Sequence, residues 1–370
     1  MGFFQEEFGL RKVINACGKM TALGASIVDD RVAEAMKRAT QDYVKIEELM
    51  EYTGKVIAEV TGAEDGCPVS GAAAGVAIAI AAVIAKTDLS LIERIPDTEG
   101  LKNEIIIQKG HAINFDTSIL QVIRMGGGKP VEVGHVNKVE RDHIEQAITD
   151  RTAALLYVKS HHTVQKGMQP IETMRDIAHQ HGLPFIIDAA AEGDFQKYIK
   201  LGADIVIYSG TKALGANTSG FICGKREWMV ACRKQYKGIG RPMKIGKESM
   251  AGLITALRLY GTQDHDKERD RSRLQRICDR LNQIAGLRCS IVQDEAGRDI
   301  WRVQIRVDEK RTGISAAELA KRLESGDPAI YLRKYHSNSG LLHVDIRPLL
   351  EGQEELIIEA IENLIGTGIQ

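Results

Sequence analysis

The chain of 370 residues has little net charge, because its 49 lysines and arginines almost balance its 50 acidic residues. A formal charge of −1 gives no overall field that would attract nucleic acid or an anionic membrane. The apolar run at 71–85, GAAAGVAIAIAAVIA, is shorter than the roughly 20 residues that span a bilayer. We interpret it as a buried helix. No early segment has the pattern of a signal peptide.

Paired cysteine motifs are also missing. None of the six cysteines forms a C-x-x-C pair or lies beside a histidine at the spacing of metal ligands. We therefore expect no metal and no disulfides, and we expect reduced thiols in a cytoplasmic protein. The cysteines are Cys17, Cys67, Cys223, Cys232, Cys278 and Cys289.

What is present is an alternation of short β-branched runs with segments of helical period, in a chain long enough for two domains. This pattern predicts a mostly parallel sheet covered by helices on both faces. Ligands of such sheets bind beyond the carboxyl ends of the strands. The expected strands are 104–108, 130–133, 154–158, 184–188, 204–209 and 220–224, and two of the expected helices are 139–148 and 170–182.

The pattern changes after about residue 245. Two long helical segments, 248–261 and 269–286, precede shorter strands at 287–293, 302–308 and 341–347. Helices are expected at 315–324 and 352–364, so the C-terminal region reads as a smaller α+β domain. We expect an N-terminal arm at 1–15, a large domain at 16–262 and a small domain at 263–370.

Lys212 follows the apolar run IVIYS in a segment of small residues, SGTKALG. A lysine forms a Schiff base with an aldehyde only as the neutral amine, which burial or a nearby cation favours. Lys212 is therefore a candidate for holding an aldehyde cofactor, with a solvated loop lysine as the alternative.

Asp188 ends the run PFIID, twenty-four residues before Lys212. A carboxylate buried at a strand end needs a cationic partner, which a protonated pyridine nitrogen would supply. The alternative is an ordinary helix N-cap.

Ser70, Gly71 and Ala72 lie at the start of the expected helix of small residues. Free N–H groups at a helix start bind anions, so this segment is a candidate phosphate site, or simply a tightly packed helix. His111, after the strand at 104–108, could stack on a flat ring or be structural. We expect the adjacent His161 and His162 to point opposite ways, which makes joint metal ligation improbable.

The order of these features resembles the pyridoxal 5'-phosphate (PLP) enzymes of fold type I, the aspartate aminotransferase superfamily. The segments RKVINACGKMTALGAS, YVKIEELMEYTGKVIAEVTGAEDGCPVSGAAAGVAIAI and YSGTKALGANTSGFICG are similar to the bacterial selenocysteine synthase (L-seryl-tRNA selenium transferase) family, as is YKGIGRPMKIGKESMAGLITAL. The resemblance covers most of residues 10–260. It implies a PLP fold-type I protein with a mostly parallel seven-stranded sheet and a smaller α+β C-terminal domain.

The resemblance also implies a chemistry. The pattern INACG begins at Ile14, so we expect no additional N-terminal region for tRNA. The branch that the chain most resembles is the D-glucosaminate-6-phosphate ammonia-lyase type. That branch implies removal of water and ammonia from D-glucosaminate 6-phosphate, which gives 2-keto-3-deoxygluconate 6-phosphate.

The resemblance assigns roles to residues. Lys212 would hold PLP and act as the base for the Cα proton, Asp188 would face the pyridinium, and His111 would stack on the ring. Ser70, Gly71, Ala72 and Ser209 would hold its phosphate. His161, His162, Tyr208 and Lys212 are open candidates for the acid that protonates the C3 hydroxyl.

The substrate carries two anionic ends. Its carboxylate calls for a bidentate arginine, for which Arg347 is the choice and Arg333 the alternative. Its phosphate would meet the loop GRPMKIGK, which offers Arg241, Lys244 and Lys247. We expect a homodimer or a higher homo-oligomer. The alternative functions are an aldolase, β-lyase or racemase acting on a small amino acid, and a tRNA-dependent selenium transferase.

Overall fold

The computed structural model describes residues 2–261, 267–294 and 298–366. The chain forms two compact units. The large unit consists of residues 27–262, and the small unit combines residues 1–26 with residues 263–370. Residues 16–26, which we expected in the large domain, group with the C-terminal region. The reason is that strand β1 (Val13–Ala16) pairs in parallel with β11 (Ala329–Leu332).

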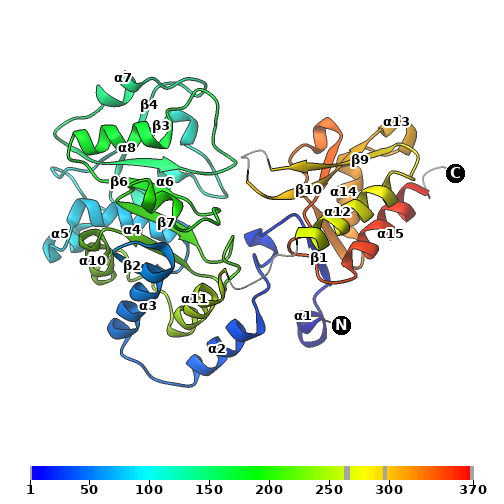
Figure 1. Cartoon of the computed structure of the whole chain (residues 1–370), viewed down its shortest axis with the longest axis horizontal. Coiled ribbons are helices and arrows are strands. Elements are labelled where there is room, and N and C mark those ends of the chain that lie inside the picture. The colour runs from blue at the N-terminus through cyan, green and yellow to red at the C-terminus, as the bar shows by residue number, and fades with distance from the viewer. Residues whose placement is uncertain (1, 262–266, 295–297, 367–370) are drawn as a thin grey trace. The chain divides into compact units, whose positions relative to one another are not determined.

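The large unit is built on a seven-stranded sheet (Figure 1), in the order β2-β8-β7-β6-β5-β3-β4. Among these strands only β8 runs in the direction opposite to the other six, so the mostly parallel seven-stranded sheet is confirmed. The strands are β2 (Asp65–Val69), β3 (Glu104–Gln108), β4 (Lys129–Val133), β5 (Thr152–Val158), β6 (Phe185–Asp188), β7 (Ile205–Ser209) and β8 (Gly220–Gly224).

Helices cover both faces of this sheet, because its side chains alternate between two apolar clusters. On β7, Ile205 and Ile207 face the cluster of α4, α6 and α10, whereas Val206 and Tyr208 face that of α8 and α11. The helices of the large unit are α2 (Asp30–Thr40), α3 (Ile46–Thr61), α4 (Ala72–Ala85), α5 (Leu89–Arg94), α6 (Ile119–Met125), α7 (Arg141–Glu145), α8 (Ile171–Gln180), α9 (Lys197–Lys200), α10 (Arg226–Lys234) and α11 (Lys247–Leu259).

Helix α4 is the apolar run of small residues, and it is buried from Gly75 to Ala85. A helix that is apolar on all sides has no polar face for contact with water, so it is buried between other elements. Here these elements include β7, β8, α6 and α10. No helix among the described residues is both long and apolar enough to cross a membrane.

Strand β2 was not expected, because its sequence DGCPV contains glycine and proline. The fold accommodates both. Pro68 lies on an edge strand, where a missing N–H is tolerated. At Gly66 a Cβ atom would come within 2.6 Å of Ile57, so the close packing of α3 on β2 needs a glycine.

The small unit contains an antiparallel sheet in the order β12 (Leu341–Val344), β10 (Trp301–Val307), β9 (Leu287–Gln293). One face of this sheet, with Val303, Ile305, Leu342 and Val344, belongs to the apolar core. Alternate positions carry polar side chains. The other elements are α1 (Phe3–Phe8), α12 (Lys267–Leu281), α13 (Glu309–Thr312), α14 (Ala316–Ser325) and α15 (Gln353–Gly366).

Candidate functional site

Asp188 is the last residue of β6 and lies at the carboxyl edge of the large sheet, where its neighbours are Val158 of β5 and Ile207 of β7. Its side chain is buried, and its Oδ1 atom accepts a hydrogen bond of 3.1 Å from the Ala190 N–H. Burial raises the pKa of Asp188, against the opposing effects of the Lys212 charge and of that hydrogen bond. A carboxylate in this position favours a cationic partner.

Lys212 lies in the connection between β7 and β8. The connection is tight: Gly210 donates its N–H to the Ser219 carbonyl at 2.8 Å and accepts from Ala216 at 2.7 Å. A Cβ atom on Gly210 would lie 2.2 Å from the Ser219 hydroxyl, so only glycine fits there. The ammonium of Lys212 acts electrostatically on Asp188. The structure thus brings together the two side chains that the sequence singled out.

His111 lies at the same edge. Its Nδ1 atom accepts a hydrogen bond of 3.4 Å from the N–H of Val158, which is the strand neighbour of Asp188. Its ring packs edge-to-face on Tyr157 with 4.5 Å between the ring centroids. Burial, followed by the charge of Lys159, lowers the pKa of His111 to about 4. At neutral pH the ring is uncharged.

The start of α4 is an uncapped helix N-terminus. The N-cap residue is Gly71, and no side-chain cap is found for this helix within the described parts of the chain. Among the residues that the structure describes, no atom outside its immediate neighbours lies within 4 Å of the position that a Gly71 Cβ atom would take. The free N–H groups and this open space fit a phosphate group.

Ser209 belongs to the same cluster, because the sheet register joins Ser209 to Gly220 and Gly220 to Val69. A Cβ atom on Gly220 would lie 3.0 Å from the Gly71 carbonyl carbon and 3.1 Å from the Ala72 nitrogen. This close approach places the end of β7 beside the start of α4. The candidate phosphate residues Gly71, Ala72 and Ser209 therefore lie together.

Ser70 makes a contact that the sequence did not predict. Its hydroxyl donates a hydrogen bond of 3.0 Å to the Met243 carbonyl, which holds the loop at 241–247 beside the start of α4. Within that loop Arg241 and Lys244 are exposed. Lys247 is engaged elsewhere: its Nζ atom donates to the carbonyls of Thr40, at 3.3 Å, and of Asp42.

Among the candidate acids, the expectation that His161 and His162 point opposite ways was wrong. They lie in a turn rather than in an extended segment, and their ring centroids are 3.9 Å apart. Even so, no group of three or more possible metal ligands occurs among the described residues. Tyr208 is buried in the core, and burial strongly raises its pKa, so it is a poor proton donor at this edge.

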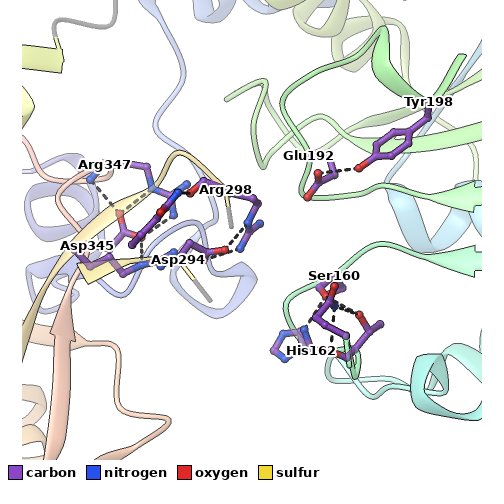
Figure 2. Close-up of polar contacts among 12 residues, drawn as sticks. Ser160, His162, Glu192, Tyr198, Asp294, Arg298, Asp345 and Arg347 are labelled. Atoms are coloured by element: carbon purple, nitrogen blue, oxygen red, sulfur yellow. Dashed lines mark hydrogen bonds and ion pairs between the residues drawn. The ribbon is translucent and has the colours of Figure 1, made fainter. Parts of the chain in front are cut away.

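Arg347 follows β12 in the small unit, and its guanidinium is paired with Asp345 (Figure 2). Its Nε atom donates to Oδ1 at 2.9 Å and its Nη2 atom to Oδ2 at 2.6 Å. Sequence reasoning missed Asp345 and its further partner Arg302. Part of the signal was available, because polar residues alternate with apolar ones along 301–307 and 342–345, but this alternation does not specify how the two runs pair.

Comparisons with solved structures define the class. A structure of a D-glucosaminate-6-phosphate ammonia-lyase matches with a TM-score of 0.94 and 43% identity over the full length of both chains. The serine palmitoyltransferase of Sphingomonas wittichii shares the fold at a TM-score of 0.57 and 16% identity, over 97% of this chain and 88% of that one. The chain has the fold of the PLP-dependent enzymes of fold type I.

The sequence comparisons then give the family. The family model described as SelA, L-seryl-tRNA selenium transferase, matches residues 13–339, and the chain belongs to this family. A D-glucosaminate-6-phosphate ammonia lyase of Salmonella typhimurium is 45% identical over 359 residues, which are 97% of each chain. A 5'-C-glycyluridine monooxygenase-decarboxylase of a Streptomyces species is also 45% identical, over 97% of this chain and 91% of that one.

A relative that carries the family's own name is more distant. The L-seryl-tRNA(Sec) selenium transferase of Aquifex aeolicus is 25% identical over 400 residues, which cover 94% of this chain and 84% of that one.

Proposed function

We propose that the protein is a PLP-dependent ammonia-lyase. It would convert D-glucosaminate 6-phosphate to 2-keto-3-deoxygluconate 6-phosphate with net release of ammonia, because the water eliminated at C3 is balanced by the water that hydrolyses the imine at C2. The observation that carries this proposal is the similarity to a lyase with that substrate over nearly the whole chain, in sequence and in structure. Its six free cysteines suit a reducing, cytoplasmic environment.

A second candidate is an oxygen-using decarboxylase of a nucleoside amino acid, because the Streptomyces relative is equally identical. The substrates named for both relatives, and the seryl group of the more distant ones, share an amine on the carbon next to a hydroxyl-bearing carbon. We therefore assign the chain to 2-amino-3-hydroxy acids as a class, and to the phosphorylated sugar acid within it. Its near-zero charge argues against a tRNA substrate.

The residues at the carboxyl edge of the large sheet fit PLP. Asp188 would pair with the pyridinium, the neutral His111 would stack on the ring, and Lys212 would bind the aldehyde. The phosphate would lie against Gly71, Ala72 and Ser209, with Ser70 holding the neighbouring loop in place. When bound, PLP supplies an electron sink for the charge that develops at Cα.

The remaining steps belong to side chains. Lys212, as a neutral amine, is the base for the Cα proton. The departing C3 hydroxyl needs a proton, and His161 and His162 are the candidates at this edge, with Lys212 itself as the third. Arg347 would bind the substrate carboxylate, and Arg241 and Lys244 its phosphate. Active enzyme would be a homodimer or a multiple of it.

The test compares the two candidate reactions directly. Purified holoenzyme is given D-glucosaminate 6-phosphate or free D-glucosaminate without oxygen, and ammonia and 2-oxo acid are measured. We expect both products from the phosphorylated substrate, little from the free one, and none from a Lys212→Ala variant. Lack of ammonia from either substrate would refute the proposal. Oxygen-dependent CO₂ release from 5'-C-glycyluridine would favour the second candidate.

A further inference from the structure

The small unit contains a row of alternating charges that ends at Arg347 (Figure 2). Arg298 donates from Nε and Nη2 to Asp294, at 2.8 and 2.9 Å. Asp294 also accepts from Arg302 Nη1 at 2.9 Å, and Arg302 donates from Nε to Asp345 at 2.9 Å. Asp345 in turn holds Arg347 through both of its oxygens.

The sheet register explains how this row forms. The antiparallel pairing of Val303 on β10 with Val344, the last residue of β12, places Arg302 beside Asp345, which directly follows β12. Because side chains alternate between faces, both residues lie on the face opposite the apolar core. Arg302 and Asp345 are buried, and buried charges of this kind persist only when they are paired and hydrogen-bonded.

The geometry of the last pair leaves part of Arg347 available. A guanidinium group presents two edges to carboxylates: one formed by Nε and one Nη atom, the other by both Nη atoms. Asp345 occupies the first edge, through Nε and Nη2. The side chain of Arg347 is 35% exposed, whereas that of Asp345 is fully buried. The second edge, formed by both Nη atoms, thus belongs to an arginine that Asp345 holds in place and that is partly exposed.

We propose that Asp345 and Arg302 are positioning residues, which fix the direction in which Arg347 presents its two Nη atoms to the substrate carboxylate that it would bind under the proposed function. The inference rests on the proposed function and narrows its substrate class to free amino acids. A planar carboxylate offers two equivalent oxygens to the two donors. The esterified seryl group of an aminoacyl-tRNA lacks that charged pair of oxygens.

Positioning and plain electrostatic attraction make opposite predictions for Asp345→Asn. The substitution removes a negative charge beside Arg347, so attraction alone would strengthen the binding of an anion. If Asp345 acts by orientation, the same substitution weakens binding, because an asparagine amide cannot accept both guanidinium N–H groups.

The experiment measures calorimetric binding of two unreactive ligands to the holoenzyme. These ligands, 6-phosphogluconate and glucitol 6-phosphate, differ only in the carboxylate at C1. We expect the wild type to prefer 6-phosphogluconate by at least tenfold. Asp345→Asn and Arg347→Lys should remove most of this preference and leave the affinity for glucitol 6-phosphate unchanged. Arg306→Gln, at an exposed position on β10, is the matched control and should keep the preference.

Arg347→Lys guards against a folding defect in the Asp345 variant, because its site is partly exposed and a lysine keeps the charge without the planar fork. A preference that survives Asp345→Asn, or that increases, would overturn the inference. A wild type that binds the two ligands equally, or binds neither, would overturn it too. Ammonia release is measured separately, so the lyase proposal can fail while the carboxylate preference stands.

Discussion

His111 shows at the scale of one residue how burial sets a charge state. The pKa of the buried His111 is lowered from 6.5 to about 4, so the folded protein binds fewer protons than the unfolded chain between these pH values. Stability contributed by the neutral ring is fully present above pH 6.5. It is lost as the pH falls towards 4, with a penalty of about 3 kcal/mol at the lower end.

We therefore expect the free energy of unfolding to decrease from pH 6.5 to pH 4 more steeply in the wild type than in a His111→Asn variant. Asparagine does not titrate, and its oxygen can still accept the Val158 N–H. Urea unfolding at several pH values measures both slopes. Equal slopes would show that His111 titrates normally in the folded state.

Sequence reasoning located some of the candidate residues and missed others for physical reasons. Asp188, Ser209 and Lys212 could be predicted because each follows or ends an apolar strand, and strand ends meet at one edge of a parallel sheet. Asp345 and Arg302 could not be paired from the sequence. Their contact depends on the register between β10 and β12, which two separate runs of residues do not specify.

At the scale of elements, some strands could be predicted from the sequence and one could not. The strands at 104–108 and 220–224 coincide with β3 and β8, because continuous apolar runs mark strands buried on both faces. Strand β2 was missed because glycine and proline, here Gly66 and Pro68, are rare in strands. Tertiary contacts explain why both residues occur in this one. Ile57 leaves no room for a larger residue, and the edge of the sheet tolerates the proline.

The contact between β8 and the start of α4 leads to a prediction for two glycines. Gly220→Ala should lower the free energy of unfolding by about 1–3 kcal/mol, because its Cβ atom would lie 2.8 Å from the Tyr208 carbonyl oxygen. Gly71→Ala should cost about 1 kcal/mol or less, because the space around it is open. The proposed cofactor phosphate would occupy that space, so Gly71→Ala should lower PLP affinity about tenfold or more.

Thermal melting without cofactor and equilibrium dialysis against PLP separate the two effects. Normal PLP affinity in Gly71→Ala would place the phosphate elsewhere. Normal stability in Gly220→Ala would mean that β8 can move away from α4.

At the scale of the whole molecule, the segment between α2 and α3 exposes apolar side chains. Tyr43 is 99% exposed, and Val44 and Ile46 are exposed beside it. Lys247 holds this segment through its backbone carbonyls, and its Nζ atom lies 5.5 Å from the centre of the Tyr43 ring. Apolar surface held in a fixed shape is typical of an interface between proteins, which supports the homodimer that we expect.

We expect the wild type to sediment as a dimer or a multiple of it at micromolar concentration. Tyr43→Asp should shift the distribution towards monomer, because a buried unpaired carboxylate is costly at an interface. Leu89→Asp, at an exposed apolar position on α5, is the control and should leave assembly unchanged. A wild type that sediments as an active monomer would contradict the prediction.

The parallel pair of β1 with β11 has a consequence for the order of folding. During synthesis the ribosome releases residues 27–262 before β11 exists, so the large unit can fold while β1 still lacks its neighbour. The small unit cannot fold until the C-terminal part of the chain has been synthesised, and a pairing between such distant segments forms slowly. Until then, Ile14 and Ala16, which are core residues of the finished unit, are exposed to solvent and to chaperones.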